Sequence, residues 1–264
     1  MKRLSVTALL GLAVAAVSSA LAANPYVVLP SGQKVEGTRV RAEADGSIIL
    51  TTDKGQMTFP KGTKLVMDEP ADYAKAVQMA DQGQYDKAIE SLEKIAAEYR
   101  NLEFGWKAEK AVASVYVRKG DYKKGVSAYE ALFTQIPDFR NEEGVLAWYL
   151  RALQGAGNTA KLKTLLDPSI ATGPRDAAAV AQVLRGKDRL AAGDIEGALS
   201  DFLRTSELFR DEPEEQAEAT YLTAECFEKL HDPRADEFFK KVVKDYPSSP
   251  FAAKAGTRAA AKTP

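Results

Sequence analysis

The sequence predicts a mainly α-helical protein: a solenoid of about five helix-turn-helix repeats, preceded by a small antiparallel β module. Two observations predict this fold. First, residues 26–66 are short β-branched runs joined by turn residues, whereas the apolar period is helical from Pro70 onward. Second, a Gly-x-Tyr type of outline recurs along the helical part, with a small residue three positions after the Tyr. The first observation separates two regions, and the second divides the longer region into repeats.

The recurring pattern begins at a glycine in four copies, and a fifth copy matches it only in part. Counting along its small-residue column gives Ala88, Gly125, Leu162, Ala198 and Ala235, at spacings of 37, 37, 36 and 37 residues. The glycines are Gly83, Gly120, Gly157 and Gly193, with Leu230 at that place in the fifth copy. A near-constant period of this length is the signature of a stacked repeat.

The residue types of the outline have physical reasons. A glycine between two helices can take the left-handed conformation that ends the first helix. The small residue lets the two helices of a pair approach closely. Proline cannot continue a helix, so Pro137, Pro168 and Pro247 are predicted to end three of the second helices.

The first 22 residues are predicted to be a secretory signal peptide. Lys2 and Arg3 precede an almost purely apolar stretch, residues 4–17, and Ala20-Leu-Ala22 fits a cleavage site. No cysteine follows that site, which excludes a lipid anchor there. We therefore expect an exported, most simply periplasmic, mature protein with no integral membrane segment.

Residues 24–68 are predicted to form the β module, as an SH3-like barrel or a curled sheet. Its strands are expected at 26–29, 34–41, 47–52, 56–59 and 64–67, with the second run broken by Gly37. About 45 residues make a small independent core, so we expect the module to lean on the helices that follow.

The helical part resembles the tetratricopeptide repeat family over residues 69–250. In the second copy the resemblance is carried by Ala113, Gly120, Tyr122, Tyr129 and Pro137. The third and fifth copies depart, with Leu150 and Thr223 where the family has a small residue. The family's usual period is 34 residues, so the longer pitch here requires longer helices or loops.

The C-terminal stretch resembles the links between repeats of bacterial cell-envelope members of this family. It reads Tyr246-Pro-Ser-Ser-Pro-Phe-Ala252. Ser249 can cap a helix whose first residue is Pro250. Residues 250–264 are therefore expected to be a capping helix, to about residue 260, and a frayed tail.

The sequence offers little that indicates catalysis. The formal net charge of −1 argues against nucleic-acid binding, which requires a basic excess. His231 is the only histidine and Cys226 the only cysteine, so a metal site has too few ligands of these types. We interpret the histidine as a turn residue and the cysteine as core, and the acidic run 211–218 as a helix start. The sequence predicts no enzyme activity and no cofactor.

The resemblance implies that the first helix of each repeat lines a concave face that binds a protein or peptide. Mapped onto this sequence, the candidate groove residues are Tyr73, Lys107, Lys110, Ser114, Arg118, Arg151 and Lys187. The five cations would form a basic track. It is either a dock for an acidic peptide or a carboxylate, or a set of solvated helix charges.

These observations favour a periplasmic scaffold or adaptor that holds a segment of another envelope protein on its concave face. The alternative is a module associated with the cell wall or with carbohydrate, acting through the β region.

Overall fold

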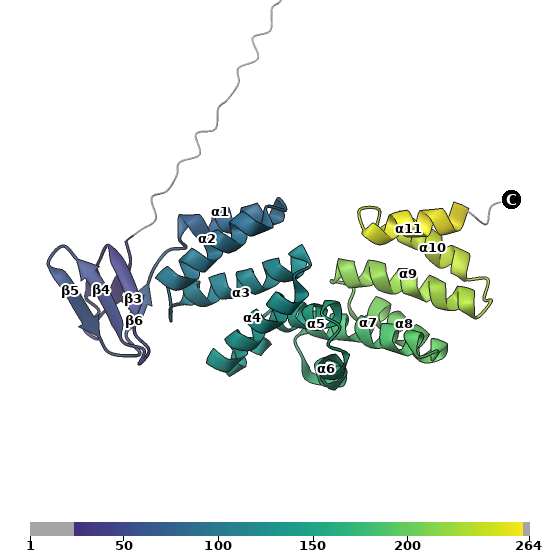
Figure 1. The fold of residues 1–264 in the computed structure, drawn as a ribbon, viewed down its shortest axis with the longest axis horizontal. Helices are drawn as coiled ribbons and strands as arrows, with labels where there is room; N and C mark the ends of the chain where they lie inside the picture. Colours follow the sequence, from purple (N-terminus) through teal and green to yellow (C-terminus); the bar gives the residue numbers. More distant parts are fainter. Residues whose placement is uncertain (1–23, 261–264) are drawn as a thin grey trace, which may run out of the picture.

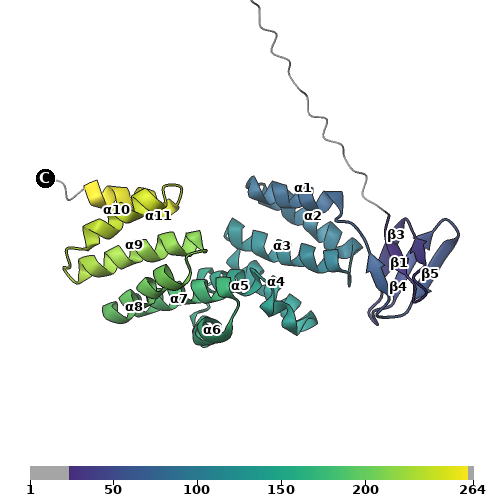
Figure 2. The same cartoon turned by 180° about the vertical axis from the view of Figure 1, so that it is seen from behind.

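The computed structural model describes residues 24–260, so the predicted signal peptide and the tail after residue 260 lie outside the described residues. The described chain is a β module followed by a curved stack of helices, with the β module at one end and the last helix at the other (Figures 1 and 2). This is the predicted fold class, a helical solenoid behind a small β module.

The β module consists of two three-stranded antiparallel sheets. Their strand orders are β2-β1-β6 and β3-β4-β5. The strands are β1 Tyr26–Val28, β2 Lys34–Glu36, β3 Arg39–Ala42, β4 Ile48–Thr52, β5 Gly55–Phe59 and β6 Lys64–Val66. Gly37 separates β2 from β3 because the backbone passes close to β4 there. A Cβ at this position would lie 2.5 Å from Leu50 Cγ.

The core of the β module is shared with the first helical repeat. Val27, Leu50 and Phe59 are buried from the module's side, and Leu102 is buried from the helical side. Asn101 adds a hydrogen bond, its side-chain amide donating to the Ala42 carbonyl over 3.3 Å. The β module therefore packs against the helices, as we expected from its small size.

Eleven α-helices follow within the described residues, as five antiparallel pairs and a terminal helix. The first helices of the pairs are α1 Ala71–Asp81, α3 Glu103–Lys119, α5 Val145–Gly155, α7 Arg175–Ala191 and α9 Pro213–Lys229. The second helices are α2 Tyr85–Glu98, α4 Tyr122–Gln135, α6 Thr159–Thr172, α8 Ile195–Leu208 and α10 Ala235–Asp245. The last helix is α11 Pro250–Ala260, and a 3₁₀ turn, Pro137–Asn141, follows α4.

The same cap joins the two helices of every pair. In each case a backbone N–H bonds to the carbonyl five residues earlier, as between Asp121 and Tyr116. The residue before that N–H is left-handed, with φ between 70° and 90° at the four predicted glycines. In the fifth pair it is His231, at φ 54°. The fifth turn is therefore centred on His231, whereas the sequence outline had placed it one residue earlier, at Leu230.

Replacing His231 with glycine is expected to raise the free energy of unfolding by about 0.5–1 kcal/mol. A side chain in the left-handed region costs about 1–2 kcal/mol, which the greater freedom of glycine in the unfolded chain partly offsets. Urea titration measures the change. Because Gly120 is also left-handed, at φ 90°, Gly120→Ala is the matched test and is expected to lower stability. A neutral or destabilising H231G would contradict the turn geometry.

The small-residue column occupies equivalent buried positions in all five repeats. All five residues are buried: Ala88, Gly125, Leu162, Ala198 and Ala235. At Gly125 a Cβ would lie 2.7 Å from a methyl group of Val117 on the preceding helix, so the approach is close. The predicted pitch thus corresponds to a repeated packing position.

The prediction that Pro168 ends a helix is wrong. Pro168 lies inside α6, which continues to Thr172. Its ring removes one helical hydrogen bond, to the carbonyl of Thr164, but both residues are exposed, so that carbonyl can bind water. Pro137 and Pro247, by contrast, follow the ends of α4 and α10 as predicted.

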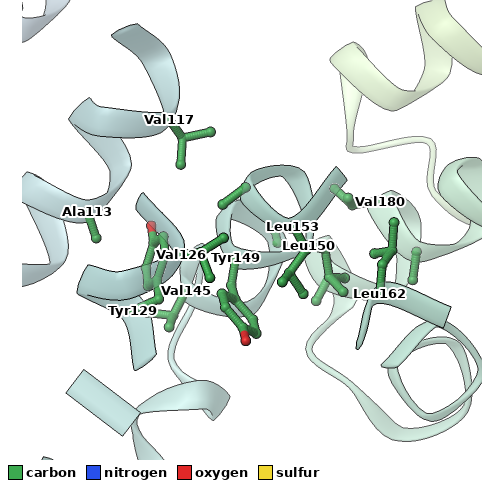
Figure 3. Close-up of a cluster of buried hydrophobic side chains, with 14 of the residues drawn as sticks. Ala113, Val117, Val126, Tyr129, Val145, Tyr149, Leu150, Leu153, Leu162 and Val180 are labelled. Carbon is green, nitrogen blue, oxygen red and sulfur yellow. The ribbon is translucent and has the colours of Figure 1, made fainter. Parts of the chain in front are cut away.

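The middle of the solenoid is held by a continuous apolar cluster that runs from α3 to α7 (Figure 3). Leu150 and Leu153 on α5 are fully buried in it, beside Leu162 of α6 and Val180 of α7. Leu150 stands where the tetratricopeptide repeat family has a small residue, and its larger side chain packs inside this cluster. α4, α6 and α8 lie on the outer side of the arch (Figure 1), which leaves α5, α7 and α9 toward the inner side.

Candidate functional site

A cavity of about 320 Å³ lies at the middle of the solenoid, where α3, α4, α5, α7 and α9 converge. We call it the central cavity. It is lined by Val117, Tyr122, Trp148, Arg151, Gln154, Gly155, Val180, Val183, Leu184, Glu215 and Glu218. Because α5, α7 and α9 are the first helices of three successive repeats, the cavity lies on the face that the sequence predicted to bind a partner.

One side of the central cavity is aromatic and aliphatic. Trp148 is half-buried, and Val183 and Leu184, which line the cavity from α7, are buried. Tyr122 begins α4 and lies against Gly155 at the end of α5. A Cβ on Gly155 would lie 2.4 Å from the Tyr122 ring, so only glycine allows this approach.

The other side of the cavity carries a charged pair between helices that are not neighbours in sequence. The Arg151 guanidinium on α5 donates to the carboxylate of Glu215 in the first turn of α9. The same guanidinium lies 5.0 Å from the centre of the Trp148 ring, in cation–π contact. Burial raises the pKa of the Glu215 carboxyl, and the charge of Arg151 only partly opposes this shift.

A second pair crosses the inner face next to the first. Lys187 Nζ on α7 lies 2.9 Å from Glu218 Oε1 on α9. Both side chains are about a third exposed or less. The two pairs together tie α5 and α7 to α9, so the cavity is bordered by charges that already have partners.

Each cation of the predicted basic track has an oxygen partner in the chain. Lys107 pairs with Glu103, and Lys110 donates to the Glu143 carbonyl over 2.7 Å. Arg118 donates to Asp81 and to the Ala80 carbonyl, both over 2.9 Å. Arg151 and Lys187 pair with carboxylates of α9. The chain therefore offers no continuous row of unpaired cations among these five, and binding of an acidic peptide stays a prediction.

The two remaining predicted site residues make local contacts. Tyr73 on α1 packs edge-on against Phe104, with ring centres 6.2 Å apart. Ser114 donates its hydroxyl to the Ala111 carbonyl of its own helix over 2.9 Å. Of the seven predicted residues, the structure brings only Arg151 into the lining of the central cavity.

The residues set aside as catalytic candidates lie where the sequence placed them. Cys226 is fully buried in α9, and burial raises the pKa of its thiol to about 11. His231 is exposed in the turn before α10. In the described part of the chain, no group of three or more His, Cys, Asp or Glu side chains is arranged to hold a metal ion. Nor, between residues 24 and 260, is any helix long and apolar enough to cross a membrane.

Sequence reasoning did not select Trp148 or Glu215. Trp148 lies outside the helix positions that the family resemblance assigns to the groove. Glu215 belongs to the acidic run that was interpreted as a helix start, which α9 confirms. Its pairing with Arg151, 64 residues away, depends on how three repeats are stacked, and no local spacing in the sequence indicates it.

A larger cleft of about 750 Å³ lies between the β module and the end of α2. Arg39, Arg41 and Ile49 line it from the strands, and Tyr99 lines it from the helical side. It is separate from the inner face of the repeats, and part of its lining, Asn24 and Pro25, adjoins residues that the structure does not describe. The central cavity is therefore the better defined candidate.

Replacing Glu215 with glutamine is expected to flatten the dependence of stability on pH in the acid range. The folded-state pKa of Glu215 is raised, so its contribution to stability is present below the unfolded-state pKa and is lost as pH rises through the folded-state pKa. Urea titrations from pH 4 upward, comparing the wild type with E215Q, measure this difference. Equal pH slopes in the two proteins would show that Glu215 is not buried as described.

The tetratricopeptide repeat family model matches residues 71–101 and 218–249. These segments hold α1–α2 at one end of the solenoid and most of α9–α10 at the other. Together with the stacked helix pairs between them, these matches support the assignment of the chain to the tetratricopeptide repeat (TPR) family. The fold of this family supports a protein-binding scaffold or adaptor role.

Comparison with solved structures found matches at low sequence identity. A thermophilic TPR protein from Thermus thermophilus is 16% identical, with a TM-score of 0.50 over 70% of this chain and 96% of that one. Nearly identical TPR-like repeats from Podosopora anserina are 16% identical, with a TM-score of 0.48 over 65% and 92%. A double mutant of MamA RS-1 is 17% identical, with a TM-score of 0.49 over 69% and 98%. A search of curated protein sequences found no match.

Proposed function

We propose that this protein is an exported scaffold that binds an extended segment of another cell-envelope protein along the inner face of its repeats. The central cavity is the main docking point. The protein acts by holding its partner in place and carries out no reaction. TPR proteins are in general non-catalytic scaffolds that bind protein partners.

The central cavity is the observation that carries this proposal. It opens between the first helices of three successive repeats, so an extended segment can contact all of them at once. Its lining joins an aromatic and aliphatic wall to a few fixed polar groups, the composition typical of binding sites. At about 320 Å³ it lies at the lower end of the range of ligand pockets and is large enough for one or two side chains of a partner.

Export is supported by the sequence of the first 22 residues, with Lys2 and Arg3 before an apolar run and a small-residue cleavage site. The C-terminal link around Tyr246 resembles those of envelope proteins. Fractionation of the native host, with N-terminal sequencing of the mature chain, tests this part. Recovery of the full-length chain from the cytoplasm would contradict it.

The docking point is tested by filling the cavity mouth. Gln154 lines the cavity and is exposed, so Gln154→Trp blocks the cavity with little effect on the core. Gln135, at the end of α4, is also exposed but lines a separate hollow formed by α2, α3 and α4, so Gln135→Trp is the matched control. We expect Q154W, and not Q135W, to lose envelope partners in crosslinked pull-downs. Retention of every partner by Q154W would overturn the proposal.

A further inference from the structure

The central cavity is more acidic than the predicted basic track implies. Its lining residues include two carboxylates, Glu215 and Glu218, and one cation, Arg151. Glu215 pairs with Arg151, and Glu218 pairs with Lys187, which is outside the lining. Glu214 adds a third carboxylate at the mouth, with Oε2 3.5 Å from Arg151 Nη2 and the side chain 81% exposed. Glu214 and Glu215 both lie in the first turn of α9.

Arg151 shows which chemical group fits the cavity. Its planar cation lies between the Trp148 ring, 5.0 Å from the ring centre, and the buried carboxylate of Glu215. An indole on one side and a carboxylate on the other form a binding site for a guanidinium or ammonium group. In the free protein, the chain's own arginine occupies this site.

Arg151 can also be displaced. Its side chain is long and 26% exposed, whereas that of Glu215 is 9% exposed. The carboxylate is therefore the more deeply buried partner of the pair, and the cation is the more accessible one. A cation that enters from solvent would release Arg151 toward the exposed Glu214, which already lies within 3.5 Å of it.

We propose that the central cavity binds an arginine or lysine side chain of the partner segment, whose cation takes the place of Arg151 between Trp148 and Glu215. This inference rests on the proposed docking function and specifies its chemistry. It reverses the sequence-based prediction of an acidic ligand, which becomes the competing outcome of the test.

The test uses three synthetic pentapeptides, acetylated and amidated, with arginine, glutamate or norleucine between flanking Gly-Ser pairs. Trp106 and Trp148 are the only tryptophans of the chain, so a Trp106→Phe background leaves Trp148 as the single fluorescent reporter in the cavity. The full chain is titrated with each peptide at low salt. We expect the arginine peptide to change Trp148 emission and to bind at least about tenfold more tightly than the other two.

Two substitutions give opposite expected effects. Arg151→Ala removes the competing cation, so the arginine peptide should bind about tenfold more tightly. Glu215→Gln removes the buried carboxylate, so its affinity should fall by about tenfold. Lys163→Ala, an exposed cation of α6 paired with Asp188, is the control and should change nothing. Circular dichroism establishes that each variant is folded.

The inference is overturned if R151A weakens binding or if the glutamate peptide binds best, since both results indicate an acidic ligand held by Arg151. Equal binding of all three peptides, or no binding, also overturns it. In each of these cases the Q154W pull-down decides the proposed function separately. Loss of partners in Q154W would support the docking site and reject only the proposed cationic ligand. Retention of partners would reject both the docking site and its proposed ligand.

Discussion

Replacing Asp201 with alanine is expected to lower the free energy of unfolding by about 3 kcal/mol. The Asp201 side chain is fully buried in α8. Its Oδ1 accepts hydrogen bonds from Gln182 and Arg185 of α7, over 2.5 and 2.6 Å. Its Oδ2 accepts from Arg185 and Arg189, over 3.1 and 2.8 Å. Alanine would leave a buried amide and two cations without this shared acceptor.

Asp167 supplies a matched control for this prediction. It also accepts from Arg185, over 2.6 Å, but its side chain is 76% exposed. Exposed ion pairs contribute about 0–1 kcal/mol, so Asp167→Ala should change stability by no more than that. Urea titration of both variants at neutral pH measures the contrast. Similar losses of unfolding free energy in D201A and D167A would show that the burial of Asp201 between α7 and α8 does not determine its contribution to stability.

Replacing Leu150 with alanine is expected to cost about 3 kcal/mol. By the family resemblance this substitution restores the small residue usual at that position, and would be predicted to be harmless or stabilising. The structure predicts the opposite. Leu150 is fully buried in the central apolar cluster beside Leu153 and Val180, so alanine leaves a void that the helices cannot fully close (Figure 3).

Leu208 is the comparison for the Leu150 prediction, since its side chain is 57% exposed at the end of α8. Leu208→Ala should change the free energy of unfolding by less than about 0.5 kcal/mol. Both variants are compared by urea titration, and Trp148, which packs against the same cluster, reports on its integrity. A Leu150→Ala protein as stable as the wild type would indicate that the third repeat is packed as in the resembling family.

The pitch of the repeats could be predicted because it is set by local requirements. A left-handed turn needs glycine, and a close helix crossing needs a small residue, so each requirement leaves one residue type at a fixed interval. Prediction was less accurate where a residue of another type occupies the turn, or where a helix accommodates a residue that usually ends it. His231 takes the left-handed position of the fifth turn one residue after the expected place, and Pro168 is tolerated at an exposed position inside α6.

The candidate site could be predicted only in part. The sequence indicated which face of the repeats is turned inward, and Arg151 does line the central cavity. It could not indicate that Arg151 pairs with Glu215, because that contact joins helices two repeats apart. A residue's charge can be read from the sequence, but the partner that neutralises it depends on the stacking of α5, α7 and α9. The prediction of a basic track considered the cations alone and left out the oxygen atoms that pair with them in the folded chain.

Site-specific photocrosslinking in the native host tests the central claim, that a partner protein docks on the inner face at the central cavity. A photoreactive phenylalanine derivative is introduced at Gln154, which lines the cavity, and in a second strain at Gln135, which lines the separate hollow formed by α2, α3 and α4. The account predicts a discrete crosslinked product with an envelope protein from position 154 and none from position 135. Crosslinks from position 135 alone, or from neither position, would contradict it.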